Sequence, residues 1–278
     1  MKKNNFGLIG KTLAHSISDV LHQEIMKEAG IKGSYGMFEV EPENIDKVIT
    51  SMRALNITGL NVTIPYKQDI MRYLDEIDQK AIEIGAVNTI TLKENKAIGT
   101  NTDYDGGKLC LDKAGIAISK NGFTLLGAGG AAKAVIKVLQ DEQARSITII
   151  SRNPDKTKLE YPDFEILAYE EIDEIKDKYC LINCTPVGTY PNIEECPIKK
   201  EAIKKYSNVV DLIYNPQKTK LLKLADEYCI NNINGLYMLI GQALKAQEIW
   251  ASKQNLDVND KKSLVDKIYE DIILKFNL

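Results

Sequence analysis

The stretch "GFTLLGAGGAAKAVIKVLQD" (122–141) runs from an apolar strand through a glycine-rich turn into an amphipathic helix. Its spacing, Gly127-x-Gly129-x-x-Ala132, is the fingerprint of a dinucleotide-binding unit when it stands between a strand and a helix. We expect Gly127 to make the tight turn, Gly129 to let the backbone approach a pyrophosphate, and Ala132 to permit close packing of helix on strand. Free N–H groups at the start of the helix would then face the phosphates.

Apolar segments continue the alternation of strand and helix on the carboxyl side of this unit. Further strands are predicted at "SITIISRN" (146–153), "CLINCTPVG" (180–188) and "NVVDLIYNP" (208–216), each ending in polar or turn residues. The pattern favours a Rossmann-like, doubly wound nucleotide-binding domain over residues 104–234.

The amino-terminal part of the chain shows the same alternation, which implies a parallel sheet with right-handed crossovers. We predict an α/β substrate domain over residues 1–103, so that the fold class is α/β with two domains. Two helical patterns, 236–254 and 260–276, end the chain. The apolar stripe of the last helix must cover another surface, and we expect residues 235–278 to return to the first domain. The elements predicted in the first domain are strands at 6–10, 35–40 and 59–65 and helices at 18–30 and 43–56.

Composition narrows the class of protein. The 278 residues carry a net charge of −3 with the two signs well mixed, so a nucleic-acid partner is not expected. No window approaches about 18 uninterrupted apolar residues and no apolar signal-peptide core is visible, so we expect no membrane span and a cytoplasmic protein. The five cysteines lack a C-x-x-C pair and only two histidines are present, so neither a disulfide framework nor a metal site is predicted. We expect the cysteines to be buried free thiols.

The tip of the strand after the glycine turn distinguishes between the two nicotinamide cofactors. NAD sites place Asp or Glu about 20 residues beyond the turn, against the ribose 2′-OH. Here the tip carries Ser151, Arg152 and Asn153, followed by Lys156, and no carboxylate stands at the tip itself. Asp155 is the one discordant charge, and we expect it to lie past the tip. A guanidinium can bind a 2′-phosphate through paired N–H donors and stack on adenine. We therefore predict NADP rather than NAD; the alternative, in which Arg152 and Lys156 are solvated loop residues, stays open.

Polar residues gather in four stretches of the first domain: "AHSIS" (14–18), "NVTIPYK" (61–67), "GAVNTI" (85–90) and "GTNTDYDG" (99–106). Separately, each is explained by caps, turns and satisfied backbone groups. Together, they describe a pocket of hydroxyl and amide groups with one ammonium and one carboxylate, which suits a small polyhydroxylated acid. A Lys–Asp pair can polarise a ketone and transfer a proton to or from its oxygen while a nicotinamide delivers hydride to the carbon. The side chains concerned are Ser16, Ser18, Asn61, Thr63, Lys67, Asn88 and Asp103.

With these motifs the chain resembles the shikimate dehydrogenase family. The resemblance runs in order from "GLIGKTLAHSIS" through "GLNVTIPYK", "NTDYDG", "GAGGAAKA" and "VVDLIYNPQKTKLL" to "GLYMLIGQALKAQEIW", which covers nearly all of the chain up to Trp250. It implies two α/β domains with a cleft between them. It also implies NADPH-dependent, reversible reduction of 3-dehydroshikimate to shikimate in the chorismate pathway of aromatic amino-acid biosynthesis, with Lys67 as the catalytic lysine and Asp103 as its partner.

The resemblance further implies a set of binding residues. A serine pair would hold the substrate carboxylate, and amide and carboxylate side chains would hold the ring hydroxyls. The glycine turn and the strand tip would hold the phosphates of the cofactor. For the substrate these residues are Ser16, Ser18, Asn61, Thr63, Lys67, Asn88, Asp103, Tyr214 and Gln242. For the cofactor they are Gly127, Ala128, Gly129, Gly130, Ala131, Ser151, Arg152, Asn153 and Lys156, with Thr185, Leu212 and Gly235 on the nicotinamide side.

The sequence departs from the family pattern at several positions. Asp19 stands where proline is common after the second serine, and its carboxylate would repel an anionic substrate unless it turns away as a helix cap. Tyr237 and Tyr66 replace a frequent proline and a frequent histidine, and "SRN" (151–153) replaces the more usual "NRT".

Other functions fit parts of this pattern. A quinate/shikimate dehydrogenase using NAD or NADP is the nearest alternative, although no acid stands at the strand tip. A non-catalytic nucleotide-binding regulator of the same fold is disfavoured by the presence of both Lys67 and Asp103. The tetrahydrofolate dehydrogenase architecture does not suit the serine pair and the "NTD" stretch. Whether the protein is a monomer or a homodimer is left open.

Overall fold

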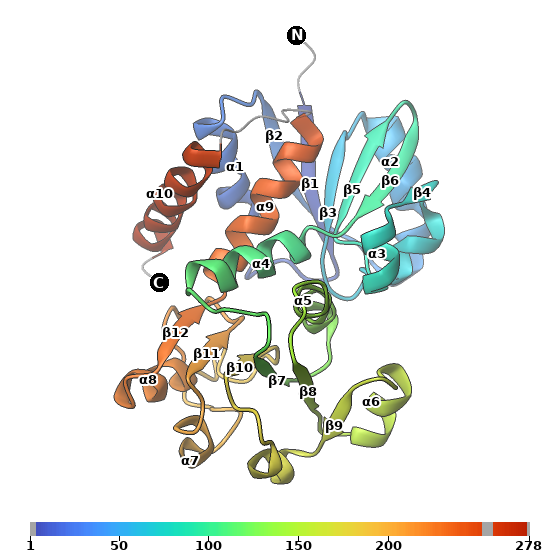
Figure 1. The fold of residues 1–278 in the computed structure, drawn as a ribbon. Helices are drawn as coiled ribbons and strands as arrows, with labels where there is room; N and C mark the ends of the chain where they lie inside the picture. The colour runs from blue at the N-terminus through green and yellow to red at the C-terminus, as the bar shows by residue number, and fades with distance from the viewer. Residues whose placement is uncertain (1–3, 252–257, 277–278) are drawn as a thin grey trace. The chain divides into compact units, whose positions relative to one another are not determined.

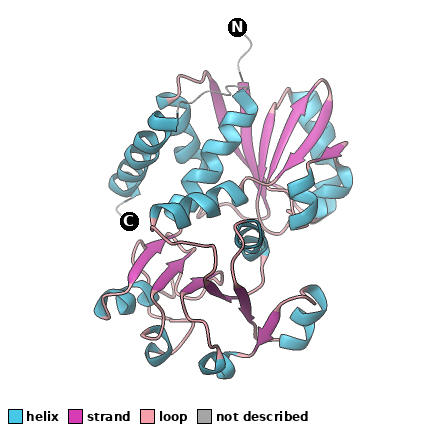
Figure 2. Cartoon of the chain, viewed as in Figure 1, coloured by secondary structure: helices cyan, strands magenta, loops and turns pink. Residues whose placement is uncertain are grey.

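The computed structural model describes residues 4–251 and 258–276, within which the chain forms two compact units. The first unit comprises Met1–Gly106 and Ile240–Lys275, and the second comprises Gly107–Leu239. Figure 2 shows that the strands gather in two sheets, each flanked by helices.

The sheet of the first unit has the order β2-β1-β3-β5-β6-β4 (Figure 1). Strands β1, β2 and β3 are parallel, whereas β5 is antiparallel to both β3 and β6. Strand β6 therefore runs in the same direction as β3, and β4 pairs with it in parallel. The prediction of a parallel sheet is thus wrong for β5, the one strand of this sheet that runs the other way. Glu94 and Asn95 both have positive φ and join β5 to β6 as a two-residue hairpin, which can connect only antiparallel strands. The strands are β1 (Asn4–Gly10), β2 (Gly33–Glu39), β3 (Gly59–Val62), β4 (Glu76–Ile77), β5 (Thr89–Lys93) and β6 (Lys96–Thr100).

Helices cover both faces of this sheet. On one face, Ile49 and Met52 of α2 (Val48–Leu55) pack into the core formed with Leu60. On the other face, Trp250 of α9 (Leu236–Ala251) stacks on Phe6, with ring centroids 4.8 Å apart. The predicted helix at 43–56 consists of the 3₁₀ turn η1 (Pro42–Lys47) followed by α2. The other helical elements of this unit are α1 (Ser18–Glu28), η2 (Asp69–Tyr73), α3 (Gln79–Ile84) and α10 (Val258–Phe276), and α4 (Asp103–Lys113) begins in it.

The register of the first sheet brings its polar segments to one edge. Asn61 of β3 pairs with Leu8 of β1 and with Thr89 of β5, and Thr89 pairs with Thr100 of β6. These residues form one row across the sheet, so the loops after β1, β3 and β6 and the segment before β5 all leave at the same edge. The four polar stretches of the sequence lie in these segments.

The sheet of the second unit is parallel throughout, with the order β12-β11-β10-β7-β8-β9. The chain moves outward from β7 to β9 and then returns to the other side of β7 through β10. The strand order therefore reverses between β7 and β10, where doubly wound sheets bind their ligands at the carboxyl ends of the strands. The strands are β7 (Gly122–Leu126), β8 (Ser146–Ile150), β9 (Glu165–Leu167), β10 (Cys180–Asn183), β11 (Asn208–Asp211) and β12 (Asn231–Asn234). The helices are α5 (Gly130–Asp141), α6 (Pro154–Glu160), η3 (Tyr169–Glu174), α7 (Lys200–Ile203) and α8 (Lys220–Glu227).

Three strands of this sheet end sooner than predicted: β8 at Ile150, β10 at Asn183 and β11 at Asp211. The Asn183 side chain accepts a hydrogen bond from the Thr185 backbone N–H, and Asp211 accepts one from Ile213. Such turns, made by an Asn or Asp side chain to the backbone two residues on, remove those N–H groups from the sheet ladder.

The cysteines and the apolar helices also differ in part from expectation. All five cysteines are free: Cys110 and Cys180 are buried, Cys184 and Cys196 are partly buried and Cys229 is exposed. The prediction of burial is wrong for Cys229, which follows the end of α8 with a positive φ of 53°. Among the helices within residues 4–251 and 258–276, none is both long and apolar enough to cross a membrane.

Candidate active site

An ion pair between Lys67 and Asp103 stands at the polar edge of the first sheet. Lys67 follows β3 through a turn, and Asp103 is the first residue of α4, after β6. Lys67 Nζ lies 2.6 Å from Asp103 Oδ2, and the two side chains are 19% and 10% exposed. This restricted contact with water strengthens the pair relative to one on an open surface. The Lys67 carbonyl also accepts from the Val87 N–H (2.8 Å), which ties its backbone to the segment before β5.

Asn88 fixes the second oxygen of the Asp103 carboxylate. Its Oδ1 accepts from the Thr102 backbone N–H (2.7 Å), so the amide NH₂ faces Asp103 and donates to Oδ1 over 2.8 Å. Both oxygens of Asp103 thus accept from donors at known positions. Asn88 lies immediately before β5.

Asn61 supports this arrangement from β3. Its Oδ1 accepts from the Tyr35 hydroxyl (2.8 Å), and its NH₂ donates to the Asn88 carbonyl (3.3 Å) and to the Thr89 hydroxyl (3.1 Å). Thr89 also donates to Asn88 Oδ1 (3.0 Å). The result is a buried network that fixes the orientation of Asn88.

The predicted carboxylate-binding serines are adjacent to each other at the start of α1. Ser16 Oγ donates to Ser18 Oγ (3.0 Å) and accepts from the Ser18 backbone N–H (3.3 Å). The helix is capped by Ile17 without a side-chain hydrogen bond, so Asp19, in its first turn, is not the cap. Burial raises the pKa of the Tyr35 hydroxyl, and the Asp19 carboxylate raises it further.

The remaining predicted substrate residues are divided between the two units. Thr63 follows β3, is partly exposed and donates its backbone N–H to the Ile9 carbonyl (2.9 Å). Gln242 is buried in α9 and belongs to the first unit. Tyr214 belongs to the second unit, where burial raises the pKa of its hydroxyl.

The glycine turn of the second unit has the geometry that phosphate binding requires. Gly127 has φ of +88°, a conformation that favours glycine, and a Cβ there would lie 2.8 Å from the Thr185 methyl group. Gly129 caps α5 with extended backbone, and a Cβ there would meet no atom within 4 Å. The free backbone N–H groups at the start of α5 are therefore accessible to an anion.

A groove of about 760 Å³ extends from this turn. The Asn153 side chain accepts from the Lys156 N–H (3.2 Å) and caps α6. Arg152, in the loop after β8, and Lys156, in the first turn of α6, are both exposed. The Tyr161 hydroxyl donates to the Ala128 carbonyl (3.2 Å) and so joins the end of α6 to the glycine turn. The glycine turn could accept the pyrophosphate of NADP, and the cationic residues Arg152 and Lys156 could accept its 2′-phosphate. The predicted residues that line the groove are Gly127, Ala128, Gly129, Ser151, Arg152, Asn153, Lys156 and Thr185.

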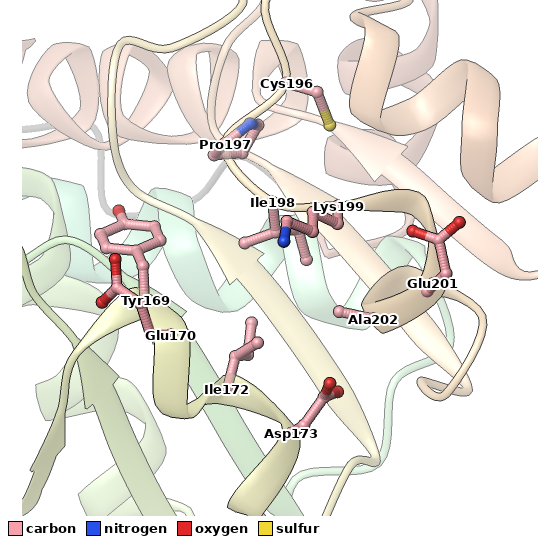
Figure 3. Close-up of a pocket in the computed structure, with 10 residues that line it drawn as sticks. All are labelled: Tyr169, Glu170, Ile172, Asp173, Cys196, Pro197, Ile198, Lys199, Glu201 and Ala202. Atoms are coloured by element: carbon pink, nitrogen blue, oxygen red, sulfur yellow. The ribbon is translucent and has the colours of Figure 1, made fainter.

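A smaller hollow of about 380 Å³ adjoins this groove (Figure 3). It lies between η3, which carries Tyr169 and Glu170, and the segment that carries Cys196 and Pro197, and all four residues also line the groove. Burial raises the pKa of Tyr169, while the nearby Arg152 guanidinium acts in the opposite direction. Sequence reasoning missed these four residues because they stand outside any motif.

Two further predicted cofactor residues, Leu212 and Gly235, touch each other. A Cβ at position 235 would lie 1.9 Å from the Leu212 carbonyl oxygen, so only glycine fits, and the Gly235 N–H donates to the Ile213 carbonyl (3.0 Å). The carboxyl ends of β11 and β12 are thus locked together.

Known proteins resemble this chain over its full length. Residues 8–90 match the family model described as the shikimate dehydrogenase substrate binding domain. A Clostridium perfringens protein named shikimate dehydrogenase (NADP(+)) is 41% identical over 273 residues, which cover 98% of this chain and 99% of that one. A chorismate mutase/shikimate 5-dehydrogenase fusion protein from Clostridium acetobutylicum superposes with a TM-score of 0.94 at 41% identity, covering 100% of both chains. A shikimate 5-dehydrogenase from Thermus thermophilus, solved with NADP(H) and shikimate, gives a TM-score of 0.83 at 27% identity and covers 95% of this chain and 99% of that one.

Proposed function

The chain belongs to the shikimate dehydrogenase family, and we propose that it catalyses the reversible, NADPH-dependent reduction of 3-dehydroshikimate to shikimate in aromatic amino-acid biosynthesis. It is an NADP-dependent oxidoreductase. The observation that carries the proposed reaction is the Lys67–Asp103 ion pair, held in place by Asn88. A donor beside the ketone oxygen stabilises the negative charge that develops there during reduction, and the Lys67 ammonium is such a donor.

The proposed mechanism assigns a distinct task to each member of this group. An ammonium carries three N–H donors, so Lys67 can hold Asp103 and donate to the ketone oxygen at the same time. Lys67 then either gives a proton to the developing alkoxide or stabilises its charge. Asp103 keeps the ammonium oriented and Asn88 keeps Asp103 oriented, so neither group has to reorganise during the reaction. The cofactor, when bound, supplies the hydride that reaches the carbonyl carbon.

The binding roles of the other residues follow from their places in the two units. We assign the substrate carboxylate to the hydrogen-bonded pair Ser16 and Ser18, which offers hydroxyl donors at the polar edge of the first sheet. We assign the 2′-phosphate of NADP to Arg152 and Lys156, because both are cationic and line the groove beside the glycine turn. On this basis the substrate domain is residues 1–103 with 235–278, and the NADP-binding domain is residues 104–234.

The proposed setting is a cytoplasmic enzyme, monomeric or homodimeric, that binds a small polyhydroxylated carboxylic acid and neither nucleic acid nor membranes. The mixed charge and net −3 of the chain support the absence of a nucleic-acid partner. Sedimentation at several concentrations distinguishes a monomer from a dimer.

Initial rates of four oxidation reactions test the proposed function. Shikimate and quinate are each assayed with NADP⁺ and with NAD⁺, and the appearance of reduced cofactor is followed. We expect shikimate with NADP⁺ to give the highest kcat/KM. A preference for quinate with NAD⁺ would instead assign a catabolic quinate/shikimate dehydrogenase. Flat traces in all four assays, from folded protein that binds NADP⁺, would favour a non-catalytic nucleotide-binding protein.

A further inference from the structure

Three polar side chains with 0% exposure lie at and beyond the carboxyl ends of β10 and β11: Asn183, Asp211 and Thr219. They do not line the cofactor groove, and the proposed mechanism uses none of them. Building on the proposed function, we propose that Asp211 is a positioning residue for the nicotinamide half of NADP. It acts through Asn183 and through the backbone that follows β11.

Asp211 receives hydrogen bonds from three separate segments. Its Oδ1 accepts from Asn183 Nδ2 (2.9 Å) and from the Ile213 backbone N–H (3.1 Å), and its Oδ2 accepts from the Thr219 hydroxyl (2.6 Å). Only a carboxylate offers acceptors on both oxygens at this position, since an amide would present a donor on one side. One buried carboxylate therefore joins the loop after β10, the loop after β11 and the start of α8.

Asn183 connects Asp211 to Thr185, a residue that lines the groove. Asn183 Oδ1 accepts from both the backbone N–H (3.0 Å) and the hydroxyl (2.7 Å) of Thr185. With Oδ1 facing these donors, the NH₂ group must face acceptors, and it donates to Asp211 (2.9 Å) and, over a longer distance, to the Val187 carbonyl (3.5 Å). Thr185 lines the groove, with its methyl group against Gly127 of the phosphate turn. The orientation of Thr185 thus depends on the carboxylate at position 211.

The sheet order indicates which half of the cofactor is affected. The loop after β8, with Arg152, lies on one side of β7, and the ends of β10 and β11 lie on the other. A dinucleotide crosses a doubly wound sheet at its switch point, so its two halves fall on opposite sides of the turn after β7. If the 2′-phosphate half lies at Arg152, the nicotinamide half lies over Thr185 and the Leu212 segment.

Two ligands separate this positioning role from a general effect on the fold. NADP⁺ and adenosine 2′,5′-bisphosphate both carry the 2′-phosphate, but only NADP⁺ carries the nicotinamide half. We expect Asp211→Asn to weaken NADP⁺ binding about tenfold in calorimetric titrations. The same variant should bind the bisphosphate within about twofold of the unmodified protein, because the loop after β8 makes no contact with the carboxylate.

Asn208→Ala is the matched control. Asn208 lies at the opposite end of β11, is also buried, and accepts from Asn231 (2.9 Å) while donating to the Tyr179 carbonyl (3.2 Å). Its loss should lower thermal stability and leave the affinity for both ligands unchanged. If Asp211→Asn fails to fold, Asn183→Ala provides the same test, because it cuts the link between Asp211 and Thr185.

The outcomes test the positioning role of Asp211 separately from the proposed dehydrogenase function. A selective loss of NADP⁺ affinity in Asp211→Asn or Asn183→Ala supports the positioning role. Equal losses for both ligands, or none for either, would show that Asp211 only stabilises the fold. An unmodified protein that binds neither ligand would contradict the proposed function itself.

Discussion

Single residues act in this molecule through the neighbours that orient them. Lys67, Asn88 and Asp103 each stand beside a strand end in the sequence, and the register of β3, β5 and β6 brings them within hydrogen-bond distance. Their grouping could be predicted from the sequence because the polar stretches that carry them together describe one pocket, although each stretch alone has an ordinary structural explanation. The supporting hydroxyls of Tyr35 and Thr89 could not, because Tyr and Thr are ordinary strand residues.

Replacing Arg152 should change the preference of the enzyme for NADPH over NADH. Arg152→Ala should raise the KM for NADPH about tenfold to a hundredfold, because it removes charge-assisted hydrogen bonds to the 2′-phosphate. The KM for NADH, which has no such phosphate, should change little. Steady-state kinetics with both cofactors measures this ratio.

Arg145→Ala is the control for Arg152. Arg145 belongs to the same unit and pairs with Asp177 (2.5 Å) beside the amino end of β8, away from the groove. Its loss should leave the NADPH/NADH ratio unchanged. An equal change of KM for both cofactors in Arg152→Ala would show that the guanidinium does not recognise the 2′-phosphate.

Strands β10 and β11 end where a side chain binds a backbone N–H group that would otherwise continue the sheet. Asn183 and Asp211 stop β10 and β11 by accepting from backbone groups two residues on, and both strands are predicted too long from apolar pattern alone. The helix of the glycine turn is predicted well, because Gly129 and the apolar periodicity after it mark its start. The β5–β6 hairpin could not be predicted in the same way, since its turn is Glu94–Asn95 rather than Asn-Gly.

Alanine at two glycine positions should have opposite effects: at position 129 it should weaken cofactor binding, and at position 235 it should lower stability. Gly129→Ala should leave the free energy of unfolding within about 0.5 kcal/mol, because the backbone is extended and the added Cβ meets no atom within 4 Å. It should nevertheless raise the KM for NADPH about tenfold or more, because the methyl group occupies the space that a pyrophosphate needs.

Gly235→Ala should destabilise the second unit by at least about 2 kcal/mol, because its Cβ would lie 1.9 Å from the Leu212 carbonyl oxygen. Urea unfolding and NADPH kinetics on both variants check the pair. A Gly129→Ala protein with unchanged KM would argue against phosphate binding at this turn.

At the scale of the whole molecule, each unit has its own buried polar groups, and His22 is one of those in the first unit. His22 is 0% exposed, stacks on Tyr35 with ring centroids 4.1 Å apart and pairs with Gln247 over 2.9 Å. Burial lowers the pKa of His22 to about 3. The division into two α/β units could be predicted from strand–helix alternation, whereas this buried histidine could not, because its surroundings come from β2 and α9, far apart in sequence.

The lowered pKa of His22 predicts acid sensitivity of the first unit. Between pH 6.5 and about pH 3 the unfolded chain binds a proton at this residue and the folded chain does not, so stability falls as pH falls through this window. The contribution is about 1.4 kcal/mol per pH unit. Relative to the unmodified protein, His22→Phe should therefore gain stability as pH drops from 6.5 to 4.5 in urea titrations. The exposed His15→Gln is the control, and a difference independent of pH in His22→Phe would contradict the buried neutral state.

The central claim is that an oriented ammonium in the first unit performs the ketone chemistry while the second unit binds the cofactor. Lys67→Ala tests it most directly, with Lys96→Ala, which removes an exposed lysine paired with Glu76 in the same unit, as control. We predict that kcat for shikimate oxidation falls by about 10²–10⁴ in Lys67→Ala while the dissociation constant for NADPH stays within about twofold. Turnover that survives the loss of Lys67, or a loss of NADPH affinity as large as the loss of turnover, would contradict the claim.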